Sequence, residues 1–100
     1  MALKHLVFWK LNGTSDEERD EQARFIKGIL EPLKHSIPGV SELKVQRNCA
    51  YHDTNWDLAL VSEFTDLAAL EAYQVHPDHV AAVAEVKARV SDRAAIDLAV

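Results

Sequence analysis

The chain has 100 residues, of which 48% are hydrophobic and 27% charged, a balance typical of one folded domain over residues 1–100 with few disordered linkers. Sixteen Asp and Glu against eleven Lys and Arg give a formal charge of -5, which argues against nucleic-acid binding because phosphate contacts need clustered cations. The single cysteine, the lack of any apolar run near about 18 residues and the lack of a secretion signal predict a cytoplasmic protein without disulfides or membrane contact.

The first predicted element is a strand over residues 3–11. Polar and apolar side chains alternate along it, but its middle is apolar on both faces, and such a strand must be covered on both sides. Two sets of side chains form these faces: Leu3, His5, Val7, Trp9 and Leu11 on one, and Lys4, Leu6, Phe8 and Lys10 on the other. Asn12-Gly13 then predicts a turn.

An amphipathic helix follows. Ser15-Asp16-Glu17-Glu18 has the form of a capping box, in which Ser15 accepts from the N–H of Glu18 and Glu18 reaches back to that of Ser15. Apolar side chains then recur at helical spacing as far as Leu33. Pro32 is expected to kink or end the helix, and Ile37-Pro38-Gly39 is a clear break.

The middle of the chain predicts two strands and a polar loop. Residues 40–49 alternate imperfectly near Ser41-Glu42, which favours a β-bulge there. Residues 48–56 are polar and predict an exposed loop. Residues 57–64 form a strong strand that is again mostly apolar on both faces.

The last part predicts two short helices and a strand. Asp66 is expected to cap a helix that carries Tyr73, and Pro77 to begin another. The second helix is predicted to bury the apolar positions Val80, Val83, Ala84, Val86 and Val90. Ser91-Asp92 should end it before a closing strand over residues 93–100.

The predicted order is βαββαβ, which with right-handed crossovers gives an α+β, ferredoxin-like fold. Its four-stranded antiparallel sheet carries the helices on one face only. If His5, Val7 and Trp9 point to the helices, the other face is apolar through Leu6, Phe8, Ala59 and Val61. Because covering these side chains would remove a large apolar area from water, we predict a homodimer whose sheets meet face to face.

The segment Tyr73-Gln74-Val75-His76-Pro77-Asp78-His79 brings a phenol and two imidazoles to one helix junction. His76 precedes the helix-starting Pro77 and is expected to cap that helix rather than to bind a ligand. His79 has the ordinary imidazole pKa near 6.5 that suits a general base at neutral pH. The alternative for Tyr73 is a core aromatic, and the alternative for the histidines is a zinc-type site with Asp97, which the capping role of His76 disfavours. We therefore expect no metal and no other cofactor.

Six segments resemble the stress-responsive A/B barrel (Dabb) family in order over essentially the whole chain. They are Lys4-His5-Leu6-Val7, Pro38-Gly39-Val40, the run from Asp57 to Phe64, Ala69-Leu70-Glu71-Ala72-Tyr73, His76-Pro77-Asp78-His79-Val80 and the late Asp97. The resemblance implies a dimeric ferredoxin-like α/β barrel. In the branch similar to olivetolic acid cyclase, it implies an aldol-type polyketide cyclase with His79 as general base and Tyr73 as hydrogen-bond donor. His5 and Asp97 would then line the pocket.

Two hypotheses from different classes therefore stand. In the first, a homodimeric domain binds a small apolar molecule near Tyr73, His79 and His5, with no turnover. In the second, a cyclase-like enzyme acts on a polyketide or another β-dicarbonyl compound, because removing a proton between carbonyls needs a base and a donor. Val7 and Trp9 share the face of His5, and the Trp9 indole could fill the cavity that a substrate would need. An open cavity that reaches both Tyr73 and His79 would favour the enzyme.

Overall fold

The computed structural model describes residues 1–100, and its elements follow the predicted order. The strands are β1 (Leu3–Leu11), β2 (Val40–Arg47), β3 (Leu58–Phe64) and β4 (Val90–Ala99). The helices are α1 (Asp16–Leu30), α2 (Leu33–Ser36), α3 (Leu67–Val75) and α4 (Pro77–Lys87). The interruption at Pro32 separates α1 from α2, as predicted.

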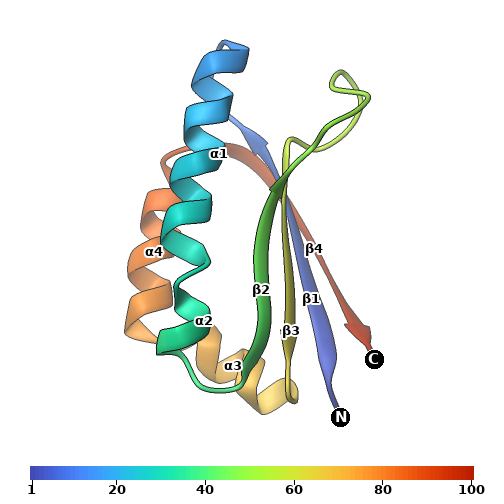
Figure 1. The fold of residues 1–100 in the computed structure, drawn as a ribbon, viewed down its shortest axis with the longest axis vertical. Coiled ribbons are helices and arrows are strands. Elements are labelled where there is room, and N and C mark those ends of the chain that lie inside the picture. The colour runs from blue at the N-terminus through green and yellow to red at the C-terminus, as the bar shows by residue number, and fades with distance from the viewer.

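The strands form one antiparallel sheet in the order β2-β3-β1-β4, and all the helices lie on one of its faces (Figure 1). This arrangement confirms the ferredoxin-like α+β fold. The register places His5 opposite Ser62 of β3 and Asp97 of β4. The bulge predicted near Ser41 is confirmed by a register shift between Val40 and Glu42.

The core lies between the sheet and the helices. The helix-facing side chains of β1, β2 and β3 are buried against apolar side chains of α1, α3 and α4. Val7, Trp9 and Leu60 are among them, so the β1 face that carries His5 is the inner face. No helix is long and apolar enough to cross a membrane.

Side-chain caps fix where the helices begin. Ser15 Oγ accepts from the N–H of Glu18 at 3.1 Å, and Asp66 Oδ1 accepts from that of Ala69 at 2.8 Å. The other half of the predicted capping box differs: Glu18 accepts from the N–H and hydroxyl of Thr14, at 2.9 and 3.1 Å, instead of from Ser15. The Glu18 carboxylate therefore accepts its hydrogen bonds from Thr14 and does not reach back to Ser15.

The buried face of α4 differs from the prediction. Val80 is 55% exposed and Ala84 is exposed, whereas Ala82 and Val86 are buried. The stripe that faces the sheet is His79, Ala82, Val83 and Val86, with the spacing i, i+3, i+4, i+7. The prediction failed because residues 80–84 are all apolar, so their periodicity selects no face.

Two strand boundaries also differ from the prediction. The strand predicted over residues 40–49 ends at Arg47, where the chain turns into the loop. The last strand begins at Val90, which pairs with Leu11, and runs through the Ser91-Asp92 pair that was expected to lie outside it. β4 is longer than predicted because β1 offers backbone hydrogen-bonding partners along its whole length, and the residues from Val90 onward can pair with it.

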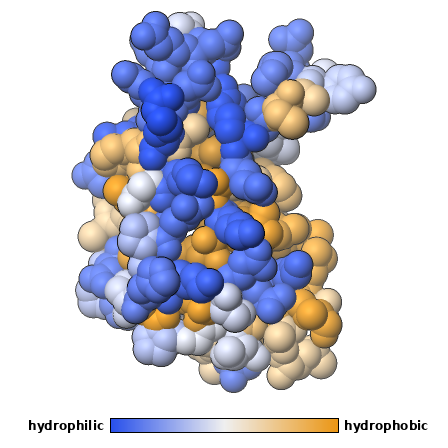
Figure 2. All heavy atoms as spheres, viewed as in Figure 1, coloured by the Kyte–Doolittle hydropathy of each residue, from blue (hydrophilic) through white to orange (hydrophobic).

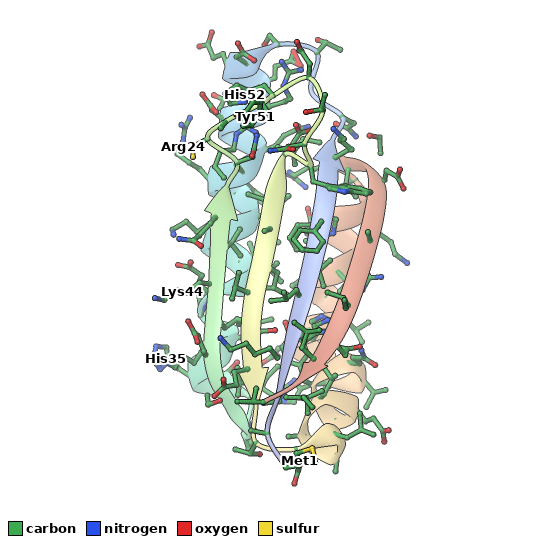
Figure 3. All side chains as sticks on the ribbon, turned by 90° about the vertical axis from the view of Figure 1, so that its right-hand side faces the viewer. Met1, Arg24, His35, Lys44, Tyr51 and His52 are labelled. Atoms are coloured by element: carbon green, nitrogen blue, oxygen red, sulfur yellow. The ribbon has the colours of Figure 1, made fainter.

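The outer face of the sheet has no cover within the chain (Figure 3). Leu6, Phe8 and Val61 are partly exposed there, and Ile96 and Leu98 of β4 are 48% and 41% exposed. In Figure 2, hydrophobic residues lie along this side, and hydrophilic residues cover the start of α1. The predicted apolar outer face is therefore present.

Gly39→Ala is expected to lower the free energy of unfolding by about 2 kcal/mol. Gly39 has φ of +84°, and an added Cβ would lie 2.6 Å from the Cβ of Ala69. Gly28→Ala is the matched control, because nothing lies within 4 Å of its added Cβ and alanine favours a helix interior by about 0.5–1 kcal/mol. Urea unfolding of both variants checks this, and equal stability of the two would contradict the role of Gly39 in the turn.

Candidate functional site

A cavity of about 600 Å³ lies between α4 and the inner face of β1 and β4. Its walls are mainly apolar: Val7, Trp9, Leu30, Leu60, Val83, Val86 and Val90. Tyr73, His79 and His5 add polar groups to the same lining. Trp9 is buried as part of the wall, and the cavity remains open beside it.

The junction of α3 and α4 positions two of these groups. His76 ends α3 and caps α4, and its Nδ1 accepts from the N–H of Asp78 at 3.1 Å. The sharp turn at His76-Pro77 folds α4 back so that His79 lies against Tyr73, with ring centroids 4.2 Å apart. His76 is thus a capping residue, as predicted, and is absent from the cavity lining.

A backbone contact sets the tautomer of His79. Its Nδ1 lies 3.2 Å from the carbonyl oxygen of Gln74. Because a carbonyl oxygen can only accept, Nδ1 carries the proton and Nε2 keeps its lone pair in the neutral ring. Burial lowers the pKa of His79 below its usual 6.5, an effect that the Gln74 contact opposes and that His5 and Arg93 reinforce. At neutral pH the side chain is therefore an uncharged base.

Tyr73 is 1% exposed and packs edge-on against Phe64 at 5.0 Å between ring centroids. Its hydroxyl has no hydrogen-bond partner in the chain, although a buried hydroxyl without one costs about 1–3 kcal/mol. Burial raises the pKa of Tyr73 to about 12. The phenol therefore keeps its proton at every ordinary pH and acts as a donor.

A carboxylate orients His5. His5 is 5% exposed on β1, and its Nδ1 lies 2.5 Å from Oδ1 of Asp97 on the neighbouring strand. The carboxylate can only accept, so Nδ1 of His5 carries the proton and the ring plane is fixed. Ser62 Oγ also donates to the carbonyl oxygen of His5 at 2.6 Å.

The structure thus brings together most of the residues singled out from the sequence. Tyr73, His79, His5, Val7 and Trp9 all line the cavity. Asp97 does not line it, and lies at an exposed position behind His5. No three His, Cys, Asp or Glu side chains converge closely enough to hold a metal ion.

Sequence reasoning missed several residues of the site, and three of them bear on its chemistry. Gln74 sets the tautomer of His79 through its backbone, which no side-chain pattern reveals. Lys87 and Arg93 also line the cavity. Arg93 could have been identified only from the register between β1 and β4. In that register Arg93 pairs with Trp9, so both side chains lie on the same face of the sheet.

The arrangement combines a neutral base and a protonated donor in one apolar cavity. A base and a donor at contact distance can bind a carbonyl compound, and can also move a proton at the carbon beside the carbonyl. The low polarity of the walls strengthens any hydrogen bond formed inside.

Comparison with known proteins agrees with this fold. The family model described as the stress-responsive A/B barrel domain matches residues 3–100. A dimeric protein of unknown function with a ferredoxin-like fold from Bacteroides fragilis is 30% identical, with 99% of this chain and 96% of that chain covered and a TM-score of 0.88. A Dabb family protein from Mesorhizobium loti is 28% identical, with coverage of 99% and 96% and a TM-score of 0.77.

A more distant likeness shows the fold alone. The hydroxynitrile lyase from Passiflora edulis is 14% identical, with 99% of this chain and 93% of that chain covered and a TM-score of 0.76. Among the curated proteins, none matches this chain.

Proposed function

Because the chain belongs to the stress-responsive A/B barrel (Dabb) family, we propose that it acts as a homodimer that binds a small, largely apolar carbonyl compound beside Tyr73, His79 and His5. The observation that carries this proposal is the Tyr73 hydroxyl, a buried donor without a partner in a residue that lines an apolar cavity. A ligand oxygen would supply the missing acceptor.

The cavity has the properties of a small-molecule site. Its volume of about 600 Å³ falls within the range of ligand pockets, and such pockets are mostly apolar with a few placed polar groups. His5 and His79 are each fixed by a hydrogen bond through Nδ1, so their orientation needs no reordering when a ligand enters. Little of the binding free energy is therefore lost to ordering these two side chains.

The outer face of the sheet supports the homodimer. Apolar side chains of β1, β3 and β4 form a continuous patch there, and the helices cover only the opposite face (Figure 1). The similar protein from Bacteroides fragilis is described as dimeric. We propose that two copies join their sheets face to face, which closes a barrel and leaves each cavity on the helix side.

Tyr73→Phe is expected to weaken binding of a β-diketone about five-fold, because it removes one hydrogen bond from a buried site. Dibutyrylmethane is a suitable probe, measured by titration calorimetry. The ligand-free variant should be at least as stable to urea as the parent, since it loses a hydroxyl that has no partner. Tyr51→Phe is the control, because Tyr51 is exposed in the loop between β2 and β3 (Figure 3). Unchanged affinity in Tyr73→Phe would remove the hydroxyl from the site.

A second candidate function is aldol-type ring closure of a β-dicarbonyl compound. The observation that favours it is the His79 tautomer, which leaves Nε2 free to take a proton while its ring touches Tyr73. His79 would remove the proton between two carbonyls, and Tyr73 would donate to the enolate oxygen that develops. Attack of that enolate carbon on a further carbonyl, more distant along the same molecule, would form the ring bond, and the proton held by His79 would pass to the new alkoxide.

A further inference from the structure

Two cations lie at the end of the cavity away from Tyr73, and they carry an inference that rests on the proposed function. We propose that Lys87 and Arg93 bind the carboxylate of an elongated apolar ligand whose carbonyl end lies at Tyr73 and His79. The ligand class is then an oxo-carboxylic acid with an apolar chain between its two polar ends.

Neither cation has an acidic partner in the chain. Lys87 and Arg93 form no ion pair, although both line the cavity. The neighbouring Arg89 is different: it pairs with Glu85 at 3.0 Å, lies 3.7 Å above the centre of the Phe25 ring and is absent from the lining. The two free cations of this region are thus the two that face the cavity.

Two independent elements give the distance between the ends of the site. Along α4, Lys87 follows His79 by eight residues, which is about 12 Å at the rise of an α-helix. Along β1, Trp9 follows His5 by four residues, about 13 Å, and Trp9 pairs with Arg93 while His5 pairs with Asp97. Because α4 and β1 run in the same direction (Figure 1), the backbone positions of Lys87 and Arg93 lie about 12 Å farther along the site than those of His79 and His5.

The walls between the two ends are apolar. Val7, Val83, Val86 and Val90 line the cavity and offer no hydrogen-bonding side chain. A ligand that spans both ends must therefore have an apolar middle. At the histidine end His5 and Tyr73 are buried and His79 is half-buried, whereas Lys87 and Arg93 are exposed, so the charged group keeps part of its contact with water.

The net charge of the side chains at the cation end of the cavity favours a ligand group with a single negative charge. Lys87 and Arg93 contribute two positive charges and Asp92, the one acid in the lining, contributes one negative charge, which leaves one net positive charge. Oδ1 of Asp92 accepts from the backbone N–H of Arg93 at 2.8 Å, so this carboxylate is held by the backbone. A single carboxylate matches that charge, and the Arg93 guanidinium can bind it with two hydrogen bonds.

The test compares decanoate with decanamide, which has the same length and no charge. Titration calorimetry of the intact protein at neutral pH is expected to show decanoate binding at least ten-fold more tightly, an advantage that falls as salt is added. In Lys87→Gln/Arg93→Gln the two affinities should become equal within a factor of two. Arg24→Gln/Lys34→Gln removes the same charge from positions outside the cavity, and should keep the full preference.

The outcomes separate this proposal from the one on which it rests. Equal affinity of decanoate and decanamide for the parent protein would overturn the carboxylate site and leave the apolar cavity as a binding site. Loss of the preference in the Arg24→Gln/Lys34→Gln control would also overturn it, because the effect would come from net charge. If neither probe binds while dibutyrylmethane does, the elongated ligand is wrong. If none of the three binds, the proposed function itself fails.

Discussion

Val61→Glu is expected to convert the proposed homodimer into folded monomers, with a rise in the dissociation constant of at least about a thousand-fold. Val61 lies on the outer face of a central strand, between Leu6 of β1 and Lys44 of β2. In the proposed dimer the two sheets would meet by two-fold symmetry, so each dimer would bury the new carboxylate twice. Each buried carboxylate without a full set of partners costs several kcal/mol.

The same substitution is mild in the single subunit. The outer face is exposed there, and the new carboxylate lies directly across from Lys44, an opposite-charge pair that stabilises neighbouring strands. Sedimentation velocity at micromolar concentration measures the change, and circular dichroism checks that the monomer is folded. Val80→Glu is the matched control, because Val80 is exposed on α4 at the helix side. A parent protein that already sediments as a monomer, or a variant that stays dimeric, would contradict the sheet-to-sheet interface.

Most of the fold could be predicted from local patterns. Alternation along β1 and β3, the Ser15 cap and Pro77 at the start of α4 each depend on a few neighbouring residues, and each was confirmed. The buried face of α4 could not be predicted, since residues 80–84 are uniformly apolar. Only packing against the sheet selects among such positions, and there it selects the stripe from His79 to Val86.

The candidate site could be predicted in part. Tyr73 and His79 are close in sequence, so the turn at Pro77 was enough to suggest that they meet. The pairing of His5 with Asp97 spans nearly the whole chain and depends on strand register, which the resemblance implied but periodicity alone does not fix. Lys87 and Arg93 resemble ordinary solvated charges in the sequence. Their shared cavity became visible only once α4 and β4 were placed on either side of it.

The acid–base character of the site predicts a particular pH dependence. Burial lowers the pKa of His79, so its neutral form persists below the usual 6.5. Exchange of the proton between the carbonyls of dibutyrylmethane should therefore rise as pH increases, bend at a value below 6.5 and stay level above it. With its pKa at about 12, Tyr73 remains a donor throughout this range, and no alkaline decline is expected near neutrality. An inflection above 6.5 would assign the base to another group.

His79→Asn is expected to reduce this exchange at least about a hundred-fold, because the amide cannot take up a proton in place of Nε2. The asparagine N–H can still donate to the Gln74 carbonyl oxygen, so the junction of α3 and α4 keeps its contact. Exchange is followed by loss of the proton signal in deuterated buffer, and calorimetry with the same probe should show affinity within a few-fold of the parent. His35→Asn, at an exposed position on α2, is the matched control and should exchange at the parent rate (Figure 3). Retained binding with lost exchange would assign proton transfer to His79, whereas an unchanged rate would leave the cavity as a binding site alone.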